Sequence, residues 1–254
     1  MSATVSYSDA KKLVPAGKWD DWLKFINDPN RWRLSVGDVE FPAGTDWSFK
    51  SRFGEVKSAV VLKDDGTSAF DRPEYTEAPF MQTIVWGKGD DGLYYYGFVD
   101  QSRPHADEPG EERQGKDDHP AVRFFHCVMG FNEKAATGKF ETPEQAAARE
   151  AHEEAGAGSA VIEVENYAPG HNPSPSFTPT WGGVVGVEVD LKKLQKPIPD
   201  PEEPINGLYF VEGGKLLAMI KKGRSDQNAY TGVSTSLSAL LIHWAHHPEQ
   251  FPHK

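Results

Sequence analysis

Three glutamates in one short segment are the side chains best suited to do chemistry in this sequence. Glu150, Glu153 and Glu154 are three and four residues apart, which places them on one face of a helix. Like charges at these spacings destabilise a helix unless a cation lies between them. Carboxylate oxygens suit Mg²⁺ or Mn²⁺ better than zinc. The segment therefore predicts a divalent-cation site, and the alternative is a solvated acidic helix, as most charge runs are.

The sequence also marks where this helix begins and ends. Thr142 is a candidate N-cap, Pro143 suits the first helical position, and Gln145 completes a capping-box pattern. Gly156 stands where helices commonly end in a left-handed residue. Small side chains between these signals allow another element to pack closely, which favours acids held in place over a fully solvated helix. These small residues are Ala146, Ala147, Ala148, Ala151 and Ala155.

At these positions the sequence resembles the Nudix box. The pattern is a glutamate, seven residues, Arg-Glu, an apolar residue, any residue, Glu-Glu, any residue and a glycine. The residues in register with it are Glu141, Arg149, Glu150, Glu153, Glu154 and Gly156. The resemblance implies metal-dependent hydrolysis of a nucleoside diphosphate linked to another group, with Mg²⁺ or Mn²⁺ as cofactor. It also implies a small-molecule nucleotide substrate and a homodimer.

The same resemblance assigns a role to each side chain of the box. Glu150 and Glu154 would be the main metal ligands, and Glu153 a further ligand or a residue that orients water. Arg149 and Glu141 would support those carboxylates. Catalysis would therefore depend on Glu153, Arg149 and Glu141, and metal binding on Glu150, Glu153 and Glu154.

The start of the box departs from the family pattern. The glycine expected six residues before Glu141 is replaced by Ala135. The nearest equivalent is Gly130, which follows the apolar run 122–128, a predicted strand. The sequence therefore predicts a loop five residues longer than usual between Gly130 and the helix, with Gly130 and Gly156 in structural roles.

Two further segments resemble the ADP-ribose pyrophosphatase branch of the family. Residues 98–104 resemble a strand that ends in Gln-any-Arg-Pro, and residues 174–178 resemble a Ser-Pro loop near the substrate. The implied substrate-binding residues are Gln101, Arg103 and Phe177. A guanidinium matches the geometry of a phosphate, although a surface arginine at a strand end is the alternative for Arg103.

The acid that this branch places after the Ser-Pro loop is missing, because residues 178–181 contain none. Either another acid serves, or the helix glutamates and metals activate water alone. The alternative to an active enzyme is a catalytically weak or inactive Nudix domain that binds a nucleotide as a sensor. The intact Arg-Glu-Ala-His-Glu-Glu sequence favours catalysis.

Composition excludes several classes of partner. The 254 residues carry a net charge of -11 with no basic stretch, so a DNA or RNA backbone would be repelled. A small phosphate substrate is compatible, because bound metal inverts the local charge. The single cysteine, Cys127, excludes an intramolecular disulfide and a cysteine zinc site, and predicts a buried inert thiol in a cytoplasmic protein. No signal-peptide run or membrane-spanning stretch is found, so no membrane partner is expected.

The chain is predicted to have two parts. Residues 1–75, with a helix at 18–26 and a strand at 58–62, form an accessory subdomain for substrate shaping or dimer contact. Residues 76–254 form the Nudix hydrolase domain, an α+β fold in which a mixed sheet lies in an α/β/α sandwich. Its predicted strands are residues 82–88, 93–99, 122–128, 161–164, 181–189 and 208–211, and its later helices are residues 214–222 and 231–247.

Overall fold

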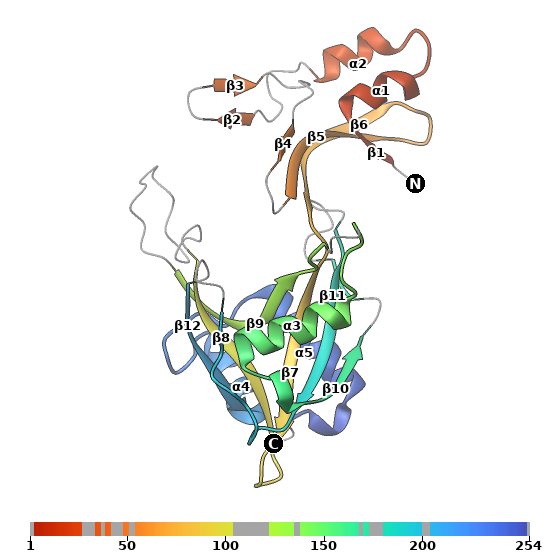
Figure 1. Ribbon diagram of the computed structural model, residues 1–254. Helices are drawn as coiled ribbons and strands as arrows, with labels where there is room; N and C mark the ends of the chain where they lie inside the picture. Colours follow the sequence, from red (N-terminus) through yellow and green to blue (C-terminus); the bar gives the residue numbers. More distant parts are fainter. Residues whose placement is uncertain are drawn as a thin grey trace. The chain divides into compact units, whose positions relative to one another are not determined.

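The computed structural model describes residues 3–26, 34–36, 39–41, 48–50, 54–103, 122–134, 138–167, 170–172, 180–199 and 204–252. The chain divides into two compact units, which Figure 1 shows in colours that follow the sequence. The first unit comprises Met1–Ala78 and Ser174–Thr180, and the second comprises Pro79–Pro173 and Trp181–Lys254. The predicted boundary at residue 75 falls within the last strand of the first unit.

The first unit is built around one long hairpin. Its middle strand β5 pairs with β6 along one edge, and β1 and β4 pair with different parts of its other edge. Ala10, Val60 and Leu62 form its small buried core. The predicted helix at 18–26 and strand at 58–62 are both present. The elements are β1 (Ala3–Val5), α1 (Tyr7–Leu13), α2 (Trp19–Ile26), β2 (Leu34–Val36), β3 (Val39–Phe41), β4 (Ser48–Lys50), β5 (Gly54–Leu62) and β6 (Ser68–Glu77).

A six-stranded mixed sheet forms the centre of the second unit. Its strand order is β10-β11-β7-β9-β8-β12. Strands β7 and β11 run parallel, and the other neighbours are antiparallel. A hairpin turn joins β7 to β8, with Gly92 at φ 81°. The strands are β7 (Phe80–Lys88), β8 (Tyr94–Arg103), β9 (Val122–Phe131), β10 (Val161–Asn166), β11 (Gly182–Val189) and β12 (Ile205–Glu212).

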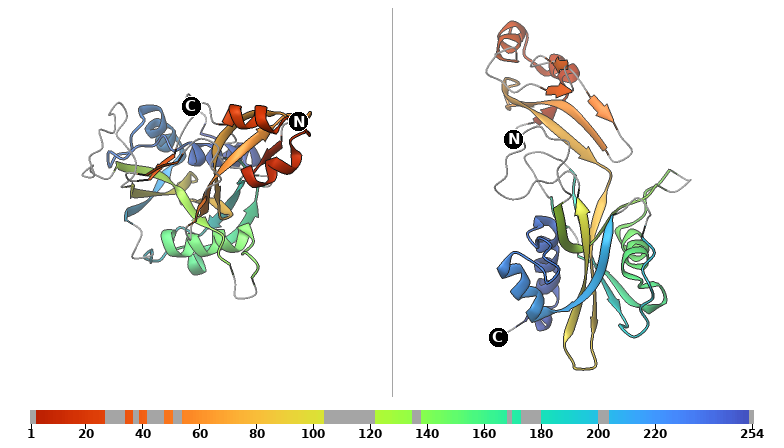
Figure 2. Two further views of the ribbon diagram at one scale, coloured as in Figure 1. Left: turned by 90° about the horizontal axis from the view of Figure 1, so that it is seen from above. Right: turned by 90° about the vertical axis from the view of Figure 1, so that its left-hand side faces the viewer.

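Helices cover both faces of this sheet, as the right-hand view of Figure 2 shows. Helix α3 (Pro143–Ala155) packs on one face, and α4 (Gly213–Lys222) and α5 (Ser234–His246) pack on the other. Short 3₁₀ turns, η1 (Gly158–Ala160) and η2 (Pro248–Gln250), follow α3 and α5. The predicted α+β class with a mixed sheet between helices is confirmed. Among the described residues, no helix is long and apolar enough to span a membrane.

Two apolar cores arise because successive strand residues point to opposite faces of the sheet. On the α4 and α5 side the core contains Phe98 and Phe125, whose rings stack with centroids 5.4 Å apart. On the α3 side Val99 and Val128 pack with the helix alanines. The predicted packed helix is thereby confirmed: four of its five alanines, Ala146, Ala147, Ala151 and Ala155, are fully buried, and Ala148 is half-buried.

Three histidines lie at the C-terminal end of α5: His246 is exposed, His247 is half-buried, and His243 is buried. His243 is fully buried in the last turn of α5. Its Nδ1 accepts a hydrogen bond from the Tyr167 hydroxyl at 2.8 Å, and its Nε2 donates to Gln250 Oε1 at 2.9 Å. Burial lowers the pKa of His243 to about 3, so the ring is neutral. The pattern of three histidines did not show this, because Tyr167 comes from a distant part of the chain.

Replacement of Tyr167 tests the strength of this buried network. Tyr167→Phe removes the hydroxyl that donates to His243 and leaves Nδ1 without a partner in the core. We expect a loss of about 1–3 kcal/mol in the free energy of unfolding, because an unsatisfied buried polar group carries its full desolvation cost. Urea denaturation followed by circular dichroism measures it, and Tyr95→Phe, at a half-buried site on β8, is the control. Equal stability of the two variants would contradict this account.

Candidate functional site

Helix α3 begins and ends where the sequence predicted. The Thr142 hydroxyl accepts a hydrogen bond from the backbone N–H of Gln145, and the Gln145 side chain accepts one from the Thr142 N–H. This is the predicted capping box, with Pro143 in the first turn. Gly156 ends the helix at φ 62°, and a Cβ there would lie 2.0 Å from the carbonyl oxygen of Gln195. Only glycine fits that position.

Arg149 is the hub of the carboxylate cluster. Its Nη2 donates to Glu141 Oε2 at 3.1 Å, and its Nη1 donates to Glu150 Oε1 at 2.7 Å and Glu153 Oε2 at 3.1 Å. Nη2 also donates to the carbonyl oxygen of Phe131 at the end of β9. Burial opposes the charge of the guanidinium, but the hydrogen bond that Arg149 donates to Glu141 and the charge of Glu150 outweigh it and raise the pKa of Arg149. The helix is thereby joined to the sheet through one cation.

Hydrogen bonds hold both the side chain and the backbone carbonyl of Glu141. Its Oε2 accepts the Arg149 hydrogen bond and a second one from the backbone N–H of Glu133 at 3.0 Å. Asn132 donates from its side chain to the Glu141 carbonyl oxygen at 3.0 Å. Burial works to raise the pKa of Glu141, but the hydrogen bonds from Arg149 and Glu133 prevail and lower it. Glu141 therefore remains a carboxylate that holds Arg149 in place.

The three glutamates predicted to bind metal differ in burial. Glu150 is 7% exposed and Glu154 2% exposed, whereas the Glu153 side chain is 41% exposed. A Cβ added at Gly130 would lie 1.9 Å from Glu150 Oε1, so the Glu150 carboxylate rests directly against the backbone of β9. Gly130 lies inside this strand, paired with Met81, and not in the loop that follows the predicted strand. The longer strand brings this glycine against the helix.

The donor set fits a hard divalent cation in its chemistry. Glu150, Glu153 and Glu154 offer only oxygen ligands, and Gly130 leaves the space that the Glu150 carboxylate occupies. In the part of the chain that the structure describes, no three His, Cys, Asp or Glu side chains converge as a ready-made metal site. Two of the three carboxylates turn to Arg149 instead. The residues fit the cation, and Arg149 supplies the counter-charge in this arrangement.

The predicted substrate-binding residues lie at the end of β8. Arg103 is exposed as the last residue of the strand. Gln101 is 2% exposed and pairs with His126, a buried residue on β9 that the sequence did not single out. Phe177 lies outside the described residues. Trp181 is 60% exposed, whereas Tyr96 is fully buried in the core.

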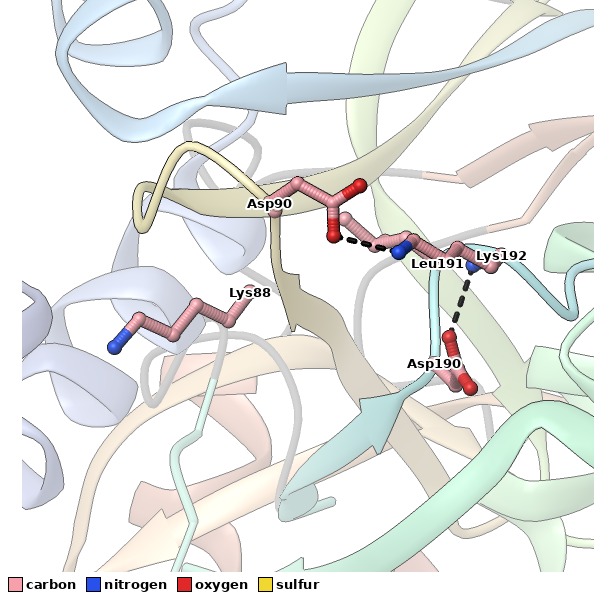
Figure 3. A pocket seen from close by; sticks show the side chains of 6 residues that line it. Lys88, Asp90, Asp190, Leu191 and Lys192 are labelled. Carbon is pink, nitrogen blue, oxygen red and sulfur yellow. Dashed lines mark hydrogen bonds and ion pairs between the residues drawn. The ribbon is translucent and has the colours of Figure 1, made fainter.

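A separate hollow lies at the opposite end of the sheet from the carboxylates. It has a volume of about 350 Å³ and is lined by Lys88, Gly89, Asp90, Asp190, Leu191 and Lys192. Figure 3 shows the ion pair across it, in which Lys192 Nζ lies 2.7 Å from Asp90. Lys88 is seven residues along β7 from Met81, the partner of Gly130, which is roughly 20 Å. The hollow is therefore not part of the carboxylate site.

The fold and the cluster on α3 define a class of site: carboxylates and one arginine on a helix packed against a mixed sheet. No protein-family model matches the chain, and no curated protein matches it either. Among solved structures, it is similar to a Nudix hydrolase from M. smegmatis, RenU. The identity is 17%, the match covers 74% of this chain and 96% of that one, and the TM-score is 0.35.

Proposed function

We propose that this protein hydrolyses the pyrophosphate bond of a nucleoside diphosphate derivative in a metal-dependent reaction, with ADP-ribose or a nucleotide sugar as the favoured substrate. The observation that carries the proposal is the cluster on α3, where Arg149 binds Glu141, Glu150 and Glu153 in the register of the Nudix box. The helix-covered mixed sheet supports it. We also propose that the protein acts on small molecules in the cytoplasm, as a homodimer.

In this proposal, Glu150, Glu153 and Glu154 hold Mg²⁺ or Mn²⁺. When bound, the cation offsets the negative charge that develops on the phosphate and lowers the pKa of the attacking water. Glu153 is our choice for the group that accepts the proton of that water, because it is the most exposed of the three. Arg149 orients the Glu153 carboxylate, and Glu141 fixes Arg149.

The reaction splits the pyrophosphate bridge into two phosphate groups. Water forms a bond to one phosphorus atom and passes its proton to the carboxylate, while the bridging oxygen leaves with the other phosphate. Arg103 is proposed to bind a phosphate oxygen through its guanidinium. Gln101 and Phe177 complete the proposed substrate-binding set.

A substrate panel tests this function directly. The purified protein is incubated with ADP-ribose, NADH, nucleotide sugars, dinucleoside polyphosphates and dNTPs, each with Mg²⁺ and with Mn²⁺. Release of AMP from ADP-ribose, or of the corresponding nucleotide from a nucleotide sugar, supports the proposal. Binding of ADP-ribose without turnover under any condition would overturn it in favour of the nucleotide sensor.

Removal of divalent cations is expected to stop hydrolysis without unfolding the protein. Turnover in excess EDTA should fall to the level of the protein-free blank and return when Mg²⁺ is added in excess. The fold should persist because Arg149 already forms ion pairs with Glu141, Glu150 and Glu153 in the absence of a cation. Phosphate release and far-ultraviolet circular dichroism are measured on the same samples. Full turnover in EDTA would exclude the metal-dependent mechanism.

A further inference from the structure

His126 and Gln101 form a buried polar pair beneath the α3 side of the sheet. His126 is 2% exposed, and its Nε2 lies 3.0 Å from the amide atom of Gln101 assigned as Oε1, on the neighbouring strand. His126 is two residues from Val128, and Gln101 is two residues from Val99. Both valines pack in the α3 core, so the alternation of strand residues places the pair on that same face.

The hydrogen bonds of His126 determine which of its nitrogens carries the proton. Nδ1 lies 2.7 Å from the carbonyl oxygen of Cys127, which can only accept a hydrogen bond, so Nδ1 is protonated. Burial lowers the pKa of the His126 ring to about 4, and the ring is neutral at pH 7. Nε2 therefore carries a lone pair and needs a donor.

The tautomer of His126 in turn determines the orientation of Gln101. A lone pair on Nε2 cannot pair with an amide oxygen, so the amide NH₂ of Gln101 must face His126. The oxygen and nitrogen of an amide have almost the same shape, and the hydrogen-bond network decides which is which. The amide oxygen of Gln101 then points the other way. This bond to His126 is the only hydrogen bond of the Gln101 side chain within the described part of the chain.

The residues around Gln101 indicate which kind of ligand its amide oxygen can contact. Arg103 follows Gln101 by two residues on β8 and therefore shares its face of the strand. The charge of Arg103 also reaches His126, where it helps to lower the pKa of the ring. An acceptor oxygen therefore lies next to a cation at the end of this strand. A phosphate ester that also carries a hydroxyl or amino group has the complementary chemistry.

We propose that His126 is a positioning residue that holds the Gln101 amide with its oxygen toward the ligand, as an acceptor for a hydroxyl or amino group beside the phosphate bound by Arg103. The proposal rests on the proposed function and adds the residue that orients the substrate-binding glutamine. A site built to accept from a particular donor discriminates strongly against analogues that lack it, because its own polar group is then left unpaired.

The tautomer can be observed without any substrate. Long-range ¹⁵N–¹H correlation spectra of histidine-labelled protein distinguish a protonated from an unprotonated ring nitrogen. The expected result for His126 at neutral pH is a proton on Nδ1 and none on Nε2. A proton on Nε2, or on both nitrogens, would overturn the proposal, because Nε2 would then require the opposite orientation of Gln101.

Kinetics show whether His126 acts through Gln101. With ADP-ribose, Gln101→Leu and His126→Leu are each expected to raise KM about tenfold with little change in kcat, the effect of one lost hydrogen bond. The double variant should be no worse than Gln101→Leu alone, and His126→Gln should recover most of the affinity, since its amide oxygen can accept from Gln101. Additive effects on KM, or equal losses in kcat, would refute the positioning role.

A matched control separates positioning from general destabilisation. His243→Leu replaces a second buried, neutral histidine, whose ring contacts Trp86 and Tyr96 in the core on the opposite face of the sheet. It should lower the free energy of unfolding and leave KM unchanged. A comparable increase in KM for His243→Leu would show that the His126→Leu effect is not specific to Gln101.

Binding measurements separate a failure of the proposed hydrolysis from a failure of the proposed role of His126. All variants are also titrated with ADP-ribose by calorimetry, so that Kd reports on the site even where turnover is absent. The same Kd pattern without turnover would contradict the proposed hydrolysis and support the role of His126. Inosine diphosphate ribose, which lacks the amino group of adenine, identifies the donor. If Gln101→Leu raises the Kd for this ligand as much as it raises the Kd for ADP-ribose, the donor is a hydroxyl. If Gln101→Leu leaves the Kd for this ligand unchanged, the donor is the amino group.

Discussion

Glu154→Gln is expected to reduce kcat/KM for the Mg²⁺-dependent reaction at least about a hundredfold. Even the outer residues that orient metal ligands are typically worth 10–100-fold, so a direct ligand should cost no less. The substitution keeps the shape of a side chain that is only 2% exposed and removes its charge. The fold should therefore remain, while the affinity for the cation falls. Initial rates as a function of Mg²⁺ concentration measure both effects.

Glu153→Gln provides a second test on the same helix. It removes the proposed proton acceptor and one partner of Arg149, so kcat is expected to fall while the protein stays folded. Glu144→Gln is the matched control, because Glu144 lies in the first turn of α3 and accepts a hydrogen bond from Asn166 that glutamine can still accept. Unchanged Mg²⁺-dependent turnover in both Glu153→Gln and Glu154→Gln would rule out the assignment.

Local signals made the helix and most strands of the second unit predictable. The capping box of Thr142 and Gln145, and Gly156 with its left-handed conformation, depend on residues within one segment of chain. The same holds for the turn between β7 and β8, where Asp91 accepts from the N–H of Leu93. Such interactions bring together residues that are close in sequence, so their pattern can be read before the tertiary structure is known.

The buried polar pairs that the sequence did not predict depend on contacts between distant residues. His126 reaches Gln101 only because β8 and β9 are neighbours in the sheet. His243 is buried because Tyr167, from another part of the chain, meets it in the core. Cys127 shows the opposite case: its apolar strand predicted burial, and burial raises the pKa of its thiol to about 12. The hydrophobic pattern predicts that a residue is buried, but not which polar group it contacts in the core.

Gly130 combines a local sequence signal with a contact between distant residues, and its replacement has the second large expected effect. The sequence shows that Gly130 lies close to the box. Only the pairing of β9 with β7 shows that this glycine makes room for the Glu150 carboxylate. Gly130→Ala would place a methyl group 1.9 Å from Glu150 Oε1 and 2.2 Å from its carboxyl carbon. The carboxylate must then leave its position against the strand and its hydrogen bond with Arg149. We expect at least a tenfold loss of kcat/KM, comparable to that of other residues that position a metal ligand.

Two variants separate displacement of Glu150 from a general effect of alanine. Gly232→Ala is the control, because no heavy atom lies within 4 Å of a Cβ at that position. Glu150→Ala removes the carboxylate together with the Cγ atom that would lie 2.6 Å from the new methyl group. If the two side chains compete for the same space, Gly130→Ala should lower the free energy of unfolding far less in the Glu150→Ala background than in the wild type, which is the signature of direct coupling. Equal losses in both backgrounds would show that Gly130 acts through the backbone of β9 and not through Glu150.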